Sequence, residues 1–153
     1  MAVDIKLFEL DQKDFLITVD QYSSLFEVDR LTTKTAREVI NKLKPHFSRH
    51  GIPDTVVSDN GQPFALSGFQ EFTNLYHFEH MTSSPGCPQS NGKVENTVKT
   101  AKKVMRKALD CKYDPYFTLL DWRNTPSKVL NSSTVSESWV GEPRLYYRRQ
   151  ASF

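Results

Sequence analysis

Three absences narrow the class of protein before any motif is considered. The chain of 153 residues has only two cysteines, Cys87 and Cys111, no secretory leader and no apolar run of membrane-spanning length. We therefore expect an intracellular protein with no disulfide framework and no membrane partner. Strong charge is also absent, because 20 basic and 18 acidic side chains leave a net charge of +2. Any surface that binds nucleic acid must then be local.

A zinc site of the histidine and cysteine type is disfavoured by spacing. Four histidines are present, but no CxxC pair accompanies them. His46 and His50 are more typical of a helix end, where imidazoles interact with the last carbonyl groups. No repeat or low-complexity tract interrupts the chain, and a hydrophobic content of 38% is sufficient for one core.

The hydrophobic periodicity predicts a three-stranded meander followed by alternating helices and strands. Strands are expected at residues 3–7, 15–19, 24–28, 55–57 and 78–82. Helices are expected at residues 35–49, 67–77 and 116–124, with a further helix after residue 91. The run FLITV (15–19) is apolar throughout, which is typical of a strand buried on both faces.

The segment SSPGCPQSN (83–91) combines prolines and glycines with small polar residues, so we expect an exposed and mobile loop. An apolar stripe at helical spacing begins after it: Val94, Val98, Ala101, Met105 and Ala108. Glu95 would then lie in the first turn of that helix. An acidic residue there stabilises the helix dipole and can pair with a lysine four residues later.

One face of the same helix is basic. Glu95, Lys99, Lys102 and Arg106 fall at i, i+4, i+7 and i+11, so they share a face that starts at the carboxylate. Such a face can be a solvated surface with internal ion pairs, or it can bind the phosphates of a nucleic acid.

Two carboxylates stand in motifs that carry a family resemblance. Asp59 is expected at the end of strand 55–57 within SDNGQPF, and 35 residues separate it from Glu95 within PQSNGKVEN. Carboxylates on two rigid elements can hold a hard divalent cation. Together with FLITVDQYSSLFEV, LKPHFSRHGIPDTVVSDNG, HMTSSPGCPQSNGKVE and LLDWRNTP, in that order, these motifs resemble the DD-35-E integrases of retroviruses and especially of gypsy-type LTR retrotransposons.

The resemblance covers residues 4 to about 126 and implies a fold and an activity. The implied fold is α/β and ribonuclease-H-like, with a five-stranded mixed sheet flanked by helices. The implied reaction is metal-dependent processing of DNA 3′ ends and strand transfer with Mg2+ or Mn2+, in which two metal ions assist the phosphoryl transfer. DNA and a homo-oligomer are the implied partners, without a small-molecule substrate, and the implied location is the nucleus.

The resemblance also assigns residues. Asp59 and Glu95 are the expected catalytic metal ligands, and the loop before Glu95 is expected to contact DNA through Gln89 and Asn91. On the basic face, Lys99, Lys102 and Arg106 are the expected DNA contacts.

The first catalytic position departs from the family. In a family pattern such as DLFEL an Asp stands where this chain has Lys6, within KLFEL. An ammonium group is a donor and a cation, so it cannot ligate a metal and competes with it for nearby carboxylates. Asp4 is the alternative ligand, although it lies two residues, roughly 7 Å, along the strand. An exposed strand face with an Asp4–Lys6 charge pair is equally compatible with the pattern, as is pairing of Lys6 with Asp59.

Two functions therefore remain open from the sequence. The chain is either an integrase core that uses Asp4, Asp59 and Glu95, or a domesticated, inactive core that still binds DNA or protein. We expect an integrase core-like domain over residues 1–126 and a helical or irregular extension of it over residues 127–153.

Overall fold

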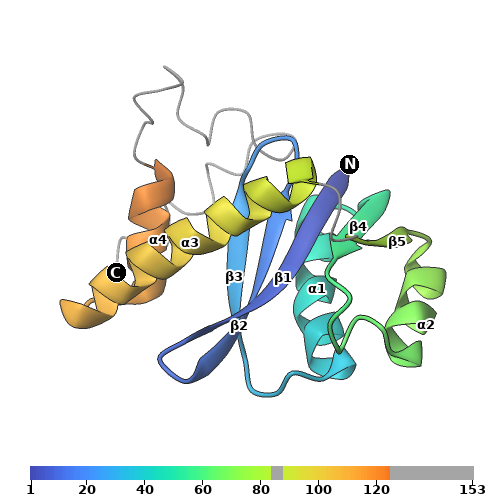
Figure 1. The fold of residues 1–153 in the computed structure, drawn as a ribbon, viewed down its shortest axis with the longest axis horizontal. Coiled ribbons are helices and arrows are strands. Elements are labelled where there is room, and N and C mark those ends of the chain that lie inside the picture. Colours follow the sequence, from blue (N-terminus) through green and yellow to red (C-terminus); the bar gives the residue numbers. More distant parts are fainter. Residues whose placement is uncertain (84–87, 125–153) are drawn as a thin grey trace.

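The structure, a computed structural model, describes residues 1–83 and 88–124, with the backbone alone for residues 88–91. Its elements, in chain order, are β1 (Ala2–Leu10), β2 (Lys13–Asp20), β3 (Phe26–Leu31), α1 (Ala36–His50), β4 (Thr55–Ser58), α2 (Ser67–Tyr76), β5 (Glu79–Thr82), α3 (Pro88–Asp110) and α4 (Pro115–Asn124) (Figure 1). This succession confirms the predicted order of strands and helices. The extension predicted for residues 127–153 lies outside the described residues.

The five strands form one mixed sheet in the order β3-β2-β1-β4-β5. The pairs β1–β2 and β2–β3 are antiparallel, which confirms the meander, whereas β1–β4 and β4–β5 are parallel. The central strand is therefore β1, with a hydrogen-bonded neighbour on each side.

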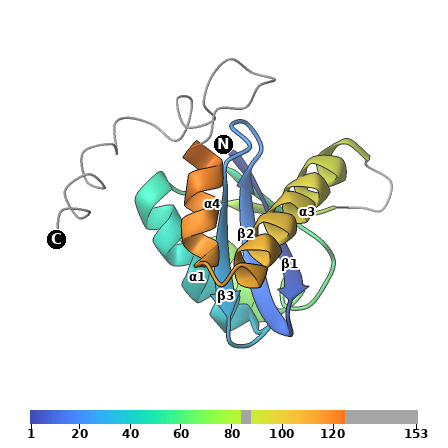
Figure 2. The ribbon, with the colours of Figure 1, turned by 90° about the vertical axis from the view of Figure 1, so that its left-hand side faces the viewer.

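Alternate residues of β1, β2 and β3 face two separate cores. Val3 and Ile5 of β1 pack with α1 and α2, whereas Phe8 and Leu10 pack with α3 and α4. Figure 2 shows α1 and α3 on opposite sides of the sheet. Residues 15–19 of β2 are buried without exception, as predicted for a strand covered on both faces.

The core under α1 and α2 is rich in phenylalanine. Phe69 is fully buried and lies edge-on to Phe64 and Phe72, with ring centroids 5.5 and 6.0 Å away. The helix α1 begins after Thr35, whose side chain accepts a hydrogen bond from the Glu38 amide at 3.3 Å. Ring packing makes this side of the sheet a closed hydrophobic layer, and the Thr35 cap fixes the start of the helix that covers it.

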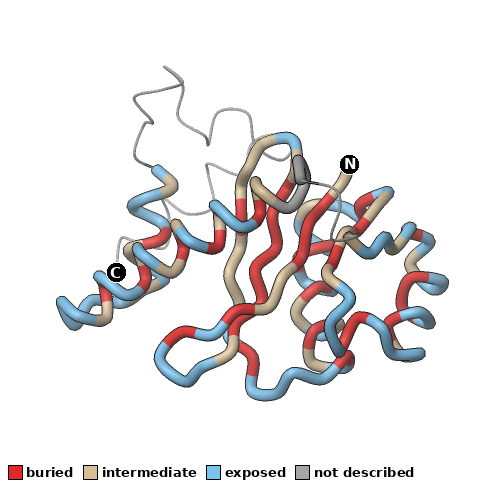
Figure 3. The backbone as a smooth tube through the Cα atoms, in the orientation of Figure 1, coloured by how far each residue is buried: buried red, intermediate tan, exposed pale blue. Residues whose placement is uncertain are grey.

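The long helix α3 covers the other face through the predicted stripe. Val94, Val98, Ala101, Met105 and Ala108 are all buried. Figure 3 shows this buried stripe along α3 and the buried positions of the central strands. None of the described helices, α3 included, is long and apolar enough to cross a membrane.

Among the predicted boundaries that differ from the structure, two lie next to the candidate site. The helix α3 begins at Pro88, so the expected loop does not extend to Asn91 and Glu95 lies two turns inside the helix, beyond its first turn. Proline is well tolerated at the first helical position, because the missing N–H has no partner there anyway. The third strand begins at Phe26, two residues late, because Ser24 adopts a left-handed conformation (φ 61°) in the turn that follows Asp20.

Candidate functional site

The candidate site lies on the α3 side of the central strand. Asp4 and Lys6 are two residues apart on β1, so they point to the same side of the sheet as Phe8. Strand β1 pairs with β4 in parallel register, with Asp4 opposite Val57. The pairing ends there, and Asp59 directly follows β4 two residues beyond Val57.

Lys6 forms an ion pair with the predicted catalytic glutamate. Its Nζ atom lies 3.8 Å from Glu95 Oε1, and the two side chains are 34% and 51% exposed. The sequence left pairing with Asp59 open, but the structure gives Glu95 as the partner. Lys6 thus bridges the central strand to α3.

The loop after β4 fixes the Asp59 side chain. Asp59 Oδ1 accepts a hydrogen bond from the Gly61 amide at 3.1 Å. A Cβ atom on residue 61 would lie only 2.9 Å from that oxygen, so a side chain there would displace the Asp59 carboxylate. Asp59 is partly exposed at the carboxyl end of its strand, as the sequence predicted.

The end of β4 is also held by β5. Ser58 Oγ donates to the Asp59 carbonyl at 2.9 Å and lies 2.8 Å from His80 Nε2. Because the hydroxyl has a single proton, His80 Nε2–H is assigned as the donor to Ser58 Oγ. Burial lowers the pKa of His80, which favours the neutral ring. These contacts fix the backbone from which Asp59 projects.

Asp4 is buried in a hydrogen-bonded network. It is 4% exposed, so the exposed strand face considered from the sequence was wrong. Gln21 Nε2 donates to Asp4 Oδ1 at 2.9 Å, and Lys93 Nζ of α3 donates to the Gln21 carbonyl. Burial raises the pKa of the Asp4 carboxyl, whereas the Gln21 hydrogen bond and the Lys93 charge oppose this shift.

The donor set does not fit the two-metal site of the resembling enzymes. Lys6 has no lone pair to offer in its charged form, and its ammonium repels a divalent cation. Asp4 Oδ2 is buried without a hydrogen-bond partner, but burial favours the protonated form of this carboxyl. Within residues 1–83 and 88–124, no group of three or more His, Cys, Asp or Glu side chains is placed to hold a metal ion.

The basic face of α3 extends further than predicted. Lys99, Lys102 and Arg106 line a shallow groove of about 390 Å3 together with Lys103, Lys107 and Asp110. The Lys102 ammonium also lies 5.6 Å from the centroid of the Phe8 ring, a cation–π contact that holds its stem on the sheet. The side chains of Gln89 and Asn91, the other predicted DNA contacts, lie outside the described residues.

His46 and His50 lie toward the end of α1, as predicted, and both also contact carboxylates of β3. His46 is buried, and its Nε2 lies 3.0 Å from Glu27 Oε2 and 2.7 Å from Asp29 Oδ2. His50 Nε2 lies 2.7 Å from Glu27 Oε1. These imidazoles therefore join α1 to β3 through carboxylates.

Sequence reasoning missed Gln21 and Lys93. Both contact the site only because the β2–β3 turn lies beside α3, and no spacing rule connects residues 72 positions apart. Lys93 lies on the flank of α3 next to its apolar stripe, which is the one signal in the sequence that it faces the protein.

The comparisons with known proteins agree with this architecture. The integrase core domain family matches residues 1–88. An uncharacterized protein of Caenorhabditis elegans is 34% identical over 131 residues, which are 82% of this chain and 10% of that protein. The Gag-Pro-Pol polyprotein of Mason-Pfizer monkey virus is 29% identical over 115 residues, 75% of this chain and 6% of the polyprotein. The chain thus spans a tenth or less of these relatives.

Solved structures show the same fold. The catalytic core domain of BIV integrase has a TM-score of 0.77 at 18% identity, with 98% of this chain and 97% of that chain covered. A chain in the structure of a simian T-cell lymphotropic virus intasome in complex with a PP2A regulatory subunit has a TM-score of 0.76 at 21% identity, with 94% of this chain and 55% of that chain covered. The ribonuclease-H-like prediction is confirmed, and the chain belongs to the integrase core domain family.

Proposed function

We propose that this domain is an integrase core that binds DNA through α3 but no longer catalyses metal-dependent strand transfer. The observation that carries the proposal is the ion pair between Lys6 Nζ and Glu95 Oε1 at 3.8 Å. It places an ammonium at the position where the resembling enzymes have their first metal-binding Asp. Glu95 is then neutralised by a cation of the protein itself.

The basic face supports the binding part of the proposal. Lys99, Lys102 and Arg106 follow Glu95 along α3, and Lys103 and Lys107 widen the same groove. Lysines act as point charges toward phosphates, so they bind a duplex with little regard to its sequence. The partner proposed for this face is the DNA backbone.

An active enzyme that uses Asp4 with Asp59 and Glu95 is the second candidate, favoured by the orphaned Asp4 Oδ2. Against it, Asp4 Oδ1 already accepts from Gln21, and the raised pKa favours an uncharged carboxyl. The β1–β4 register also places Asp4 opposite Val57, two residues short of Asp59.

The binding part is tested by a salt titration with duplex DNA. Replacing Lys99 and Lys102 together by Ala should weaken binding about equally across sequences and lower the salt slope by about 1 per lost contact. The matched control removes two exposed cations of α1, Arg37 and Lys44, and should leave the slope unchanged. An unchanged affinity and slope in the α3 double variant would mean that these lysines form an ordinary solvated face and do not contact DNA.

The catalytic part is tested by joining and reverse-joining assays together with calorimetry of Mg2+ and Mn2+. The chain itself should show no joining activity and only weak metal binding, whereas Lys6→Asp should bind metal at least about tenfold more tightly, because an oxygen ligand replaces a repelling cation. Metal-dependent joining by the unchanged chain that Asp4→Asn abolishes would favour the second candidate. Calorimetry decides the case where neither form joins DNA, because it does not require other domains.

A further inference from the structure

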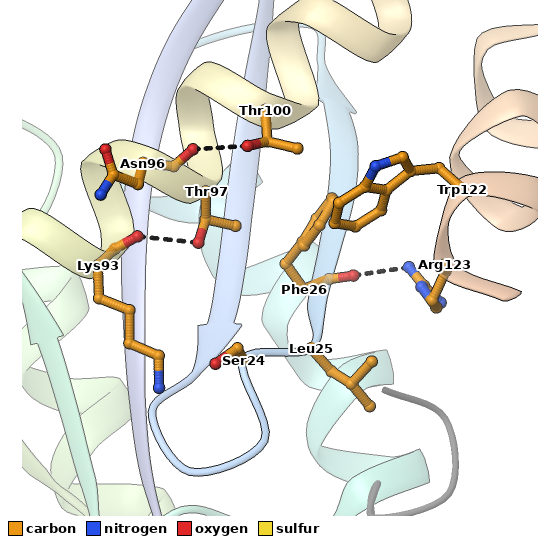
Figure 4. Close-up of a pocket in the computed structure, with 9 residues that line it drawn as sticks. All are labelled: Ser24, Leu25, Phe26, Lys93, Asn96, Thr97, Thr100, Trp122 and Arg123. Carbon is orange, nitrogen blue, oxygen red and sulfur yellow. Dashed lines mark hydrogen bonds between the residues drawn. The ribbon is translucent and has the colours of Figure 1, made fainter. Parts of the chain in front are cut away.

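A second feature of the α3 face is a cleft between α3, α4 and the start of β3. The cleft has a volume of about 250 Å3 and is lined by Phe26, Lys93, Thr97, Thr100, Trp122 and Arg123, among others. Figure 4 shows the Trp122 indole beside the Phe26 ring, with Thr97 and Thr100 on the α3 wall. The volume is below the roughly 300–1,000 Å3 of pockets that enclose drug-sized ligands, so the cleft suits one side chain or one nucleobase.

The aromatic wall is accessible and held in place. Trp122 is 43% exposed, and its ring centroid lies 5.5 Å from that of the buried Phe26. Arg123 Nη2 donates to the Phe26 carbonyl at 2.6 Å, which joins α4 to β3 directly beside the indole. An exposed indole on a fixed support is a surface on which a planar ring can stack.

The polar part of the cleft has one sign of charge. Lys93 and Arg123 contribute cations, which also donate to the carbonyls of Gln21 and Phe26, and the lining within the described part of the chain includes no acidic side chain. Thr97 and Thr100 donate their hydroxyl protons to backbone carbonyls of α3, at 2.9 and 3.0 Å, so their oxygens remain available as acceptors. The ligand that fits this lining is therefore planar, carries donors and is attached to an anion.

The position of the cleft identifies the anion. Lys103 and Lys107 of the basic groove follow Thr100 by three and seven residues, which places them on the same side of α3 within about 10 Å along the axis. A strand whose phosphates follow this groove would bring one end to the cleft. Charge complementarity and this continuity favour a nucleotide over an acidic peptide.

We propose that the cleft between α3 and α4 binds an unpaired nucleotide at the end of a DNA duplex, with its base stacked on Trp122. The inference rests on the proposed function, because the duplex itself would be held by the basic face of α3. Blunt duplexes cannot place a base in the cleft without opening a base pair. Duplexes with a short single-stranded overhang can do so directly.

The test is fluorescence anisotropy with one duplex in two forms, blunt and with a short overhang. The unchanged chain should bind the overhang form about tenfold more tightly, a preference typical of one stacked base. Trp122→Leu keeps an apolar side chain on Phe26 but removes the indole, and Thr100→Phe fills the cleft; each should reduce the affinity ratio to about one. The matched control is Phe117→Leu, on an α4 side chain that is 69% exposed and outside the cleft, and it should keep the ratio.

The outcomes separate this inference from the proposed function. If the unchanged chain binds both forms equally, the cleft inference fails and the binding function stands. If it binds neither form, both fail. A ratio that survives Trp122→Leu and Thr100→Phe would also overturn the inference, and so would a change in sedimentation with Trp122→Leu at constant ratio, because that result assigns the cleft to a second copy of the chain.

Discussion

The two faces of the sheet differ in how completely their charged side chains are paired. On the α1 face, Glu27 and Asp29 of β3 meet His46, Arg49 and His50 of α1 at 2.7 to 3.0 Å. These charges are paired among themselves at the margin of a phenylalanine-rich core. That face has the properties of a stabilising layer.

On the α3 face the charges are only partly paired. The Lys6–Glu95 contact is longer, at 3.8 Å, and both side chains are partly exposed. Lys99, Lys103 and Lys107 lie beyond it in an open groove. The difference teaches that alternate residues of the same strands contribute to a closed, charge-paired layer on one side and, in the function proposed above, to a binding surface on the other.

The largest expected effect is on the free energy of unfolding and concerns the α1 face. Phe69→Ala should lower the free energy of unfolding by about 3–5 kcal/mol, because it leaves a cavity among stacked rings in the α1 and α2 core. Urea denaturation measures the loss. Leu75→Ala on the same helix is the matched control, since its side chain is 71% exposed, and it should change little. Equal losses in the two variants would contradict the closed-core description of this face.

A second prediction concerns the paired charges of the α1 face. The hydrogen bond from His50 and the charges of His46 and Arg49 outweigh burial and hold the pKa of Glu27 at about 2, below the unfolded value of 4.5. A lowered folded pKa stabilises the protein above pH 4.5, and this contribution is lost as the pH falls toward 2. The contribution should be on the order of 2–3 kcal/mol.

The measurement is urea denaturation between pH 2 and pH 6. In Glu27→Gln the loss of stability over this window should be smaller than in the unchanged chain by that amount. Glu71→Gln, which removes an exposed carboxylate of α2, should retain the original dependence. If both variants retained it, the low pKa of Glu27 would have no part in acid unfolding.

The smallest expected effect belongs to the α3 face. Lys6→Met removes the ion pair with Glu95, and the free energy of unfolding should fall by less than about 1 kcal/mol, because a partly exposed pair is screened by solvent. The same urea titration measures it. A loss comparable to that of Phe69→Ala would mean that Lys6 holds α3 on the sheet, and the division between the two faces would then be wrong.

Most of the fold could be predicted because local patterns agreed with it. The continuous apolar run at residues 15–19 indicated a strand buried on both faces, and the stripe from Val94 to Ala108 indicated the buried side of α3. The errors were local. Pro88 was interpreted as part of a loop although it opens a helix, and the left-handed Ser24 shortened β3 at its start.

The site was less predictable. The motifs around Asp59 and Glu95 identified the family, and the position of Lys6 within KLFEL identified the departure from it. The sequence could not show which carboxylate pairs with Lys6, because side-chain contacts between β1 and α3 depend on how the helix crosses the sheet. The burial of Asp4 depends in the same way on Gln21 and Lys93, which reach it from two other elements.

The central position of β1 also governs the order in which the domain can fold. The meander β1–β2–β3 has local pairings, with Leu10 opposite Lys13, and can form early. The β1–β4 pairing joins residues 53 apart, such as Asp4 and Val57, so it closes a long loop and forms later. During synthesis, the meander emerges before α3, and its α3-facing apolar residues remain uncovered until that helix arrives. We therefore expect slow steps and chaperone dependence to arise from the α3 half of the molecule.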